Sequence, residues 1–383
     1  MSKLKILTIV GARPQIIKAA AISRAIDDHF SEQVEEYILH TGQHYDNNMS
    51  AVFFEQLGIP KPDFQLDHIA TRHALQTGLM MEGIEKVLQE NQFDMVIVYG
   101  DTNSTLAGTL AASKLNIPVA HVEAGLRSYD MDMPEEQNRI VSDHLSSLLF
   151  APTQTAMDNL KHEGLTDSPA VFKNYYQRRA VLSGDVMYDN SMYFAQIAEQ
   201  DSMIFHELDL ERENFILATI HRPSNTDNEN NLREILKALL SIAAIEKTQI
   251  VFPVHPRTRK MIECQLPADV RSELYNSAYI KIIEPASFFD IIMLEKYAKL
   301  VVTDSGGVQK EAYFYQTPSV IVREQTEWVE IVESGAAVLA KPECESILKS
   351  YSEIVNRQVE FKPFFGDGHA AEKIVNEIIN YLS

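Results

Sequence analysis

The chain has 383 residues, of which 45% are hydrophobic and 23% are charged, a composition typical of globular proteins. This length predicts roughly two or three domains. A formal net charge of −20 argues against a nucleic-acid or anionic-membrane surface, so any phosphate site must be locally positive. The two cysteines, Cys264 and Cys344, exclude a disulfide scaffold and suit a reducing compartment.

The N-terminal segment predicts a first strand and not a targeting signal, because its apolar part is too short for a signal peptide. No run along the chain approaches the roughly 18 apolar residues that a membrane span requires. We therefore expect a soluble, cytoplasmic protein without a membrane or nucleic-acid partner.

Short apolar runs alternate with helical patterns along the chain. The helical patterns include residues 104–115 and 232–245. The runs are rich in Val, Ile and Leu, as is typical of strands buried on both faces. Their alternation with helices predicts an α/β protein with parallel sheets covered on both sides. The expected strands are residues 5–10, 36–41, 95–100, 119–123, 148–151 and 181–184, followed by 215–220, 250–254, 280–284, 300–303 and 319–322.

Eleven strands would fit either one large sheet or two smaller ones. We favour two, with a boundary after Gly184, because the charged stretch 199–213 separates the two series of strands. The predicted domains are residues 1–184 and 185–367. Apolar side chains recur at helical spacing in residues 370–382, which predicts an amphipathic closing helix. Open α/β sheets bind ligands beyond the carboxyl ends of their strands, so the residues there are the candidate site.

The first and third expected strands end in polar turns. Gly11-Ala12-Arg13-Pro14-Gln15 combines a glycine, a cation and a helix start, which suits an anion; a tight turn with a solvated Arg13 is an equal alternative. Asp101 in Gly100-Asp101-Thr102-Asn103-Ser104-Thr105 is placed to act as acid or base. Capping of the next helix is the stronger interpretation of this loop alone.

The fourth expected strand ends in His121-Val122-Glu123-Ala124-Gly125-Leu126-Arg127. Alternation along a strand would place His121 and Glu123 on the same face. A carboxylate at the end of an apolar strand is costly unless it is paired or functional, which favours a functional Glu123. The alternative is a buried ion pair between Glu123 and Arg127.

A helix start follows at Met133-Pro134-Glu135-Glu136-Gln137-Asn138-Arg139. The helix dipole favours two acids in a first turn, which by itself would explain Glu135 and Glu136. Asn138 and Arg139 lie one turn further and are placed to orient the acids.

In the second half, His221-Arg222-Pro223 follows a buried strand and enters a loop. Because histidine titrates near neutral pH, a functional His221 is favoured over a satisfied core residue. The next strand ends in His255-Pro256-Arg257-Thr258-Arg259, where Lys260 makes a solvated basic patch a serious alternative.

The most informative segment is residues 302–311, in which a strand meets Ser305-Gly306-Gly307 and then a helix. Glycines allow backbone N–H groups to approach a diphosphate, and the helix dipole favours its charge. Glu311, one turn into the helix, is placed to accept both hydroxyls of a ribose. The segment is neither a Walker A motif nor G-x-G-x-x-G, so ATP and NAD are not indicated.

Taken together, the ordered strand-end motifs resemble the non-hydrolysing UDP-N-acetylglucosamine 2-epimerases over essentially the whole chain. That resemblance implies a GT-B-like fold, with two Rossmann-like doubly wound domains, an interdomain cleft, a nucleotide site in the second domain and a closing helix 368–383 that returns to the first. It also implies a UDP-sugar substrate, a homodimer, and no metal or redox cofactor.

The resemblance places site residues by motif. The catalytic positions are Asp101, Glu123, Glu135 and His221; the UDP-sugar-binding positions are Arg13, Lys18, Ser305, Gly306, Gly307 and Glu311; Arg139, Asn138 and His255 are supporting residues. The family reaction is elimination of UDP to a 2-acetamidoglucal followed by re-addition, which inverts carbon 2 of the sugar in surface-polysaccharide synthesis.

Two departures bear on the substrate. Many family members have Arg-Pro where Trp328-Val329 stands, and the form found here resembles the UDP-2,3-diacetamido-2,3-dideoxyglucuronate 2-epimerases. The segment Thr41-Gly42-Gln43-His44-Tyr45-Asp46 differs after His44 from members that substrate regulates, so allosteric activation is not carried over. The diacetamido uronate epimerase, a hydrolysing epimerase and a GT-B glycosyltransferase stay open as alternatives.

Overall fold

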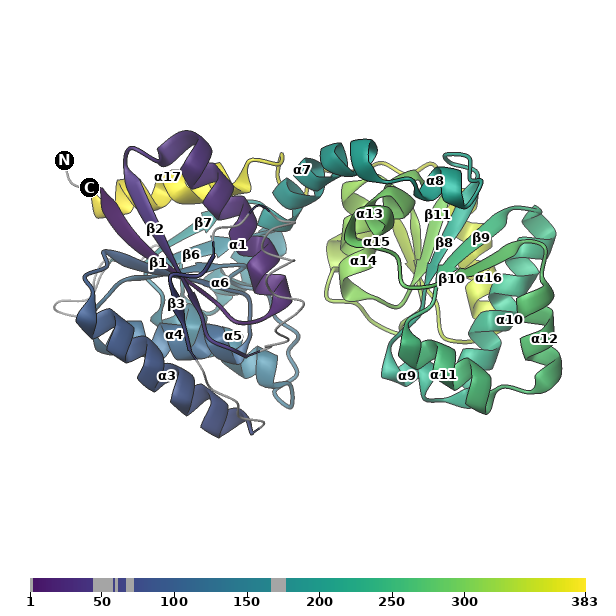
Figure 1. Ribbon diagram of the computed structural model, residues 1–383, viewed down its shortest axis with the longest axis horizontal. Helices are drawn as coiled ribbons and strands as arrows, with labels where there is room; N and C mark the ends of the chain where they lie inside the picture. Colours follow the sequence, from purple (N-terminus) through teal and green to yellow (C-terminus); the bar gives the residue numbers. More distant parts are fainter. Residues whose placement is uncertain (1–2, 44–57, 59–60, 67–71, 167–176) are drawn as a thin grey trace. The chain divides into compact units, whose positions relative to one another are not determined.

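The computed structural model describes residues 3–43, 58, 61–66, 72–166 and 177–383, which form two α/β units (Figure 1). One unit comprises Met1–Asn190 and Pro363–Ser383, and the other comprises Ser191–Lys362. The division after Asn190 falls within helix α7 (Val186–Asp201), a few residues beyond the boundary expected after Gly184. In the described part of the chain, no helix is both long and apolar enough to span a membrane.

The first unit contains a seven-stranded parallel sheet in the order β3-β2-β1-β4-β5-β6-β7. The chain enters at the middle, runs to one edge and then returns across β1 to the other edge. This doubly wound order creates a switch point between β1 and β4. The strands are β1 (Leu4–Val10), β2 (Val34–His40), β3 (Phe64–Gln65), β4 (Met95–Tyr99), β5 (Val119–Val122), β6 (Leu148–Ala151) and β7 (Arg179–Leu182).

The second unit repeats this plan with a six-stranded parallel sheet in the order β10-β9-β8-β11-β12-β13. Its switch point lies between β8 and β11. Short β3 and β13 were not predicted, because two or three residues carry no apolar run that could indicate a strand. The strands are β8 (Phe215–Thr219), β9 (Gln249–Pro253), β10 (Ile280–Ile283), β11 (Leu300–Thr303), β12 (Ser319–Ile321) and β13 (Ala337–Leu339).

Helices connect the parallel strands in both units. The first unit has α1 (Arg13–Ala25), the π-helical η1 (Ile26–Phe30), α3 (His73–Glu90), α4 (Asn103–Lys114), α5 (Pro134–Leu145), α6 (Gln154–His162) and α17 (Ala370–Leu382). The second has α8 (Ile204–Glu207), α9 (Pro223–Thr226), α10 (Glu229–Glu246), α11 (Pro256–Gln265), α12 (Ala268–Asn276), α13 (Phe288–Tyr297), α14 (Gly306–Phe314), α15 (Val329–Glu333) and α16 (Cys344–Val355).

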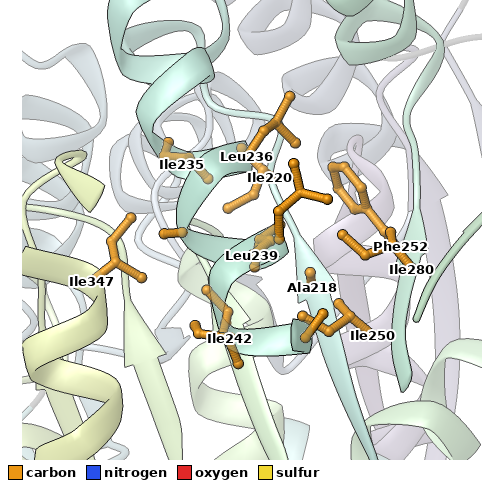
Figure 2. Packing of buried hydrophobic residues seen from close by; sticks show 14 of the residues in the cluster. Ala218, Ile220, Ile235, Leu236, Leu239, Ile242, Ile250, Phe252, Ile280 and Ile347 are labelled. Carbon is orange, nitrogen blue, oxygen red and sulfur yellow. The ribbon is translucent and has the colours of Figure 1, made fainter. Parts of the chain in front are cut away.

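The core of the second unit lies between its sheet and the helices that cover it. Figure 2 shows Leu236 and Leu239 of α10 packed beside Ile220 and Phe252, with Ile347 of α16 on the other side of α10. Leu236 and Leu239 lie three residues apart, so they share the face of α10 that covers the sheet. Burying each such side chain contributes about 1.5–3 kcal/mol.

The closing helix α17 belongs to the first unit and packs against α1 (Figure 1, yellow against purple). Ile374 and Ile378 are buried on its inner face. The helix has no side-chain cap of its own; the carboxylate of Asp189 in α7 accepts hydrogen bonds from the N–H groups of Ala370 (3.1 Å) and Ala371 (2.7 Å). A distant acid thus satisfies the open helix start.

A buried carboxyl in β2 makes the stability of the first unit depend on pH. Thr8 Oγ1 donates to Glu36 Oε1 at 2.5 Å. Burial raises the pKa of Glu36 from 4.5 to about 7, although hydrogen bonds from Ser23 and Thr8 oppose the shift. The folded chain therefore holds a proton in this interval that the unfolded chain releases, and stability falls as the pH rises from 4.5 towards 7.

Glu36→Gln should remove this dependence, because the amide needs no proton. We compare the free energy of unfolding of the variant with that of wild type at each pH. We expect the variant's value, relative to wild type, to be about 2–3 kcal/mol higher at pH 8 than at pH 4.5. Urea unfolding at the two pH values measures the effect. An equal change in the free energy of unfolding at both pH values would contradict a raised pKa for Glu36.

Candidate active site

The turn after β1 is held against the turn after β4. Gln15 Oε1 accepts from the N–H groups of Gly11 (2.9 Å) and Ala12 (3.1 Å), and Gln15 Nε2 donates to the carbonyl of Tyr99 at 2.9 Å. A Cβ on Gly11 would lie 2.1 Å from Ser104 Oγ, so only glycine allows this approach. The two turns therefore lie side by side at the carboxyl edge of the sheet, with an exposed Arg13 opening α1.

The segment after β2 reaches the same edge. Thr41 Oγ1 and Ser104 Oγ are 2.7 Å apart, and Gln43 Oε1 accepts from Ser104 N at 3.1 Å. The remaining residues of the motif that continues through His44 and Asp46 lie outside the described part of the chain.

Four charged side chains meet at this edge, two from the helices α1 and α5 and two from the turns after β4 and β5. We call them the acid–base cluster: Lys18, Asp101, Glu123 and Arg139. Lys18 Nζ lies 2.6 Å from Glu123 Oε2. Arg139 Nη2 lies 2.6 Å from Asp101 Oδ2 and 3.2 Å from Glu123 Oε1. The Glu123 side chain is 10% exposed and that of Asp101 is 35% exposed, so Asp101 is the acid more open to solvent.

Arg139 and its neighbour Asn138 hold the two acids in place. Arg139 also donates to the backbone carbonyl of Glu123, and Asn138 Nδ2 donates to that of Asp101 at 2.9 Å. Burial disfavours the charged guanidinium, but the carboxylates of Asp101 and Glu123 outweigh it and raise the pKa of Arg139. Arg139 therefore keeps its charge between the two acids. Asp101 does not cap α4, since that role belongs to Thr102.

The backbone at Glu123 corrects two expectations. Strand β5 ends at Val122, and Glu123 has a φ of +71°, which is unusual for a residue with a side chain. Strand alternation therefore does not set the direction of the Glu123 side chain. The prediction that alternation places Glu123 on the same face as His121 was wrong in its premise, because Glu123 lies outside the strand. The buried Glu123–Arg127 pair is not the arrangement found either, because Arg127 pairs with Asp143 and Glu163, at 2.7 Å each.

Asp143 organises a second, fully buried network behind the acid–base cluster. Asp143 Oδ1 lies 2.7 Å from His121 Nδ1, Asp143 Oδ2 accepts from Gly125 N at 3.1 Å, and His121 Nε2 lies 2.7 Å from the carbonyl of Gly100. Burial acts to raise the pKa of Asp143, but the charges of His121 and Arg127 lower it overall. Sequence reasoning missed Asp143, although it lies one helical turn after Arg139 on the buried face of α5.

The two acids at the start of α5 have different environments. Glu136 is buried and accepts from the N–H groups of Ser128 (2.9 Å) and Tyr129 (3.0 Å). Glu135 is exposed in the first turn. Within the described residues, no ion pair joins Glu135 to the acid–base cluster, so its role stays a prediction.

In the second unit, Asp304 holds the strand-end histidine. The buried Asp304 carboxylate accepts from the N–H groups of His221 and Arg222, both at 3.0 Å, and from Asn225 Nδ2 at 3.0 Å. His221 Nδ1 lies 3.6 Å from Asp304 Oδ1, and the imidazole is 48% exposed. Asp304 lies within the predicted strand–turn–helix segment 302–311, and the sequence alone indicates no role for it.

The start of α14 is a strand–turn–helix anion site in form. Ser305 Oγ accepts from Val308 N at 3.4 Å and caps the helix. The N–H groups of Gly306 and Gly307 belong to the first turn, where no intrahelical acceptor exists. Glu311 Oε2 would lie 4.0 Å from a Cβ on Gly307, so the carboxylate reaches back to this turn.

His255 serves a local role at another helix start. Its Nδ1 accepts from Arg257 N at 3.3 Å and caps α11. Arg257 pairs with Asp227 at 2.5 Å and Arg259 with Glu284 at 2.9 Å, so these cations are neutralised at the surface. Among the described residues, no group of three or more His, Cys, Asp or Glu side chains is arranged to hold a metal ion.

Two Rossmann-like units with polar strand ends make this an α/β protein of the GT-B-like class, as the sequence predicts. Comparison with known proteins identifies the family. A family model described as UDP-N-acetylglucosamine 2-epimerase matches residues 27–379. The chain therefore belongs to the UDP-N-acetylglucosamine 2-epimerase family and is an enzyme, which confirms the resemblance in the motifs.

Two similar sequences and one similar solved structure represent the matches. UDP-2,3-diacetamido-2,3-dideoxy-D-glucuronate 2-epimerase of Pseudomonas aeruginosa is 46% identical over 97% of this chain and 98% of its own. A UDP-N-acetylglucosamine 2-epimerase homolog of Methanococcus maripaludis is 45% identical over 98% and 100%. The crystal structure of Methanocaldococcus jannaschii UDP-GlcNAc 2-epimerase with UDP-GlcNAc and UDP matches with a TM-score of 0.80 at 40% identity, covering 98% of this chain and 100% of that one.

Proposed function

We propose that this enzyme interconverts UDP-GlcNAc and UDP-ManNAc by inverting carbon 2 of the sugar. The observation that carries the proposal is the acid–base cluster, in which Arg139 holds Asp101 and Glu123 together at the strand edge. Two carboxylates held by one cation suit a reaction that removes a proton and returns one. The family, and the relatives that act on UDP-GlcNAc, support the substrate.

The proposed chemistry is elimination and re-addition, because carbon 2 has no adjacent ketone to acidify its hydrogen. A carboxylate takes the carbon 2 proton, the C1=C2 double bond forms, and the C1–O bond breaks with its electrons passing to UDP. UDP then adds back to C1 while carbon 2 receives a proton on its other face. Asp101, Glu123 and Glu135 are the proposed acid and base groups.

The remaining residues are proposed to bind the nucleotide and stabilise the leaving group. Arg13, His221 and the Ser305–Gly306–Gly307 turn meet the departing diphosphate, with Lys18 beside the reacting carboxylate. Glu311 accepts the ribose hydroxyls. Arg139, Asn138 and His255 support these groups. The proposed domains are residues 1–184 with helix 368–383 and residues 185–367, and the proposed reaction uses no metal or redox cofactor.

Proton NMR of the purified enzyme with UDP-GlcNAc in deuterated water tests the proposal. We expect deuterium at carbon 2 and the appearance of UDP-ManNAc. Free sugar and UDP would instead identify a hydrolysing epimerase. Absence of exchange, with transfer of the sugar to an added acceptor, would identify a glycosyltransferase.

A second candidate substrate is UDP-2,3-diacetamido-2,3-dideoxyglucuronate. Trp328 favours it, because this position resembles the subgroup acting on that sugar, as does the Pseudomonas aeruginosa relative at 46% identity. The same NMR experiment with both sugars decides between them. A carbon 2 exchange rate at least tenfold higher for one sugar identifies the substrate.

We further propose that the enzyme is a cytoplasmic homodimer that supplies surface-polysaccharide synthesis. The family resemblance supports each part. Light scattering of the purified protein measures its mass in solution, and a mass equal to one chain of 43.3 kDa would contradict the dimer.

A further inference from the structure

The loop from Arg323 to Trp328, which we call the β12–α15 loop, is fastened to the start of α14. Trp328 Nε1 donates to the carbonyl of Gly306 at 3.1 Å, and Thr326 Oγ1 donates to Gln309 Oε1 at 2.6 Å. Trp328 and Gln309 are buried, so both contacts are protected from water. The loop is therefore held in a defined position beside the first turn of the helix.

This position brings a carboxylate to the helix start. A Cβ on Gly306 would lie 2.3 Å from Glu327 Oε1 and 3.8 Å from Arg323 Nη1. Gly306 is the first residue of α14, whose opening N–H groups and dipole attract negative charge. The carboxylate of Glu327 thus lies beside Gly306, in the first turn of α14.

Glu327 is paired with Arg323, and the two differ in how easily they could change partner. Arg323 Nη1 lies 2.8 Å from Glu327 Oε2, with the arginine side chain 12% exposed and the glutamate 40% exposed. A guanidinium this buried needs a negative partner in every state, whereas a glutamate this open can return to water at small cost. Although close, Arg323 Nη1 makes no well-aligned hydrogen bond within the described residues.

We propose that Glu327 stands in for the nucleotide diphosphate in the free enzyme. Its carboxylate neutralises Arg323 and lies against the α14 start; on binding, the diphosphate displaces it, takes over the helix start and accepts hydrogen bonds from Arg323. The exchange leaves Arg323 paired before and after. Because a carboxylate competes with the ligand, Glu327 weakens UDP binding and favours its release. This inference rests on the proposed function, which places the diphosphate at α14.

Removing the competing charge tests the proposal. Glu327→Gln should bind UDP about fivefold more tightly by titration calorimetry, the size of a partly exposed ion pair. Affinity for uridine, which has no phosphate, should stay unchanged. Glu324→Gln, on the same loop and exposed, is the matched control and should bind UDP as wild type does. Unchanged or weaker UDP binding by Glu327→Gln would overturn the proposal.

Arg323→Lys tests the other partner, because a lysine cannot offer the two parallel N–H donors of a guanidinium. It should weaken UDP about tenfold and leave uridine unaffected; equal losses for both ligands would indicate a structural role only and overturn the exchange. Wild type that binds no UDP would refute the proposed function itself. Wild type that binds UDP while Glu327→Gln gains nothing refutes the displacement alone.

Discussion

Replacing Glu123 by Gln is expected to lower the turnover of epimerisation by about a thousandfold, at the centre of the range for losing a general acid or base. The amide keeps the size of the side chain, and its single oxygen can accept from one of the two cations, Lys18 or Arg139, which flank Glu123 at 2.6 and 3.2 Å. It cannot take a proton from carbon. The loss should therefore fall on turnover and on carbon 2 exchange, with the affinity for UDP nearly unchanged.

The measurement is the initial rate of deuterium incorporation at carbon 2, with UDP affinity determined in parallel. Asp130→Asn is a suitable control, because Asp130 is an exposed acid in the loop between β5 and α5. Full exchange activity in Glu123→Gln would remove Glu123 from the reaction. Loss of UDP affinity as large as the loss of rate would make it a binding residue.

Asp143→Asn should lower the free energy of unfolding by about 3–5 kcal/mol, the cost of removing one partner of a buried charge network. Asp143 and His121 are fully buried, and Arg127 pairs with the same carboxylate at 2.7 Å. Because asparagine carries no charge, His121 loses its compensating carboxylate and Arg127 keeps only Glu163. Urea unfolding at neutral pH measures the change.

Glu163→Gln provides the matched control, because Glu163 pairs with Arg127 at the same 2.7 Å but is partly exposed. We expect it to cost at most about 1 kcal/mol. The pKa of Asp143 is lowered in the folded chain, so its contribution is present above the unfolded pKa and is lost as the pH falls. The Asp143→Asn variant should therefore approach wild type in acid; an equal deficit at every pH would contradict a charge effect.

Local patterns predicted much of the fold. The closing helix was predicted as residues 370–382, and α17 spans Ala370–Leu382. The apolar run at residues 300–303 likewise matches β11. Such elements bury one or both faces, and the spacing of their apolar side chains along the sequence indicates which faces are buried. Strands β3 and β13 are too short for a pattern, since their pairing comes from neighbouring strands.

The candidate site also has features that the sequence predicts and features that it does not. Ser305 could be placed at a helix start from the Ser-Gly-Gly turn, whereas Arg139, which was expected to orient Glu135 and Glu136, pairs with Asp101 and Glu123 instead. The partners of Glu123 could not be predicted, because its left-handed backbone takes it out of the strand pattern. Asp143 lies in no motif, and the motif that contains Asp304 indicated no role for it; each matters through groups brought to it by another element.

By itself, the sequence determined the fold class, the family and the set of strand-end residues from which a site is built. Each is encoded locally, in hydrophobic periodicity and in short motifs at the ends of strands. Only the tertiary structure decided that Glu123 lies between Lys18 and Arg139, and that Glu327 rests on the start of α14. Those contacts depend on strand order and on packing between distant segments, which no local pattern specifies.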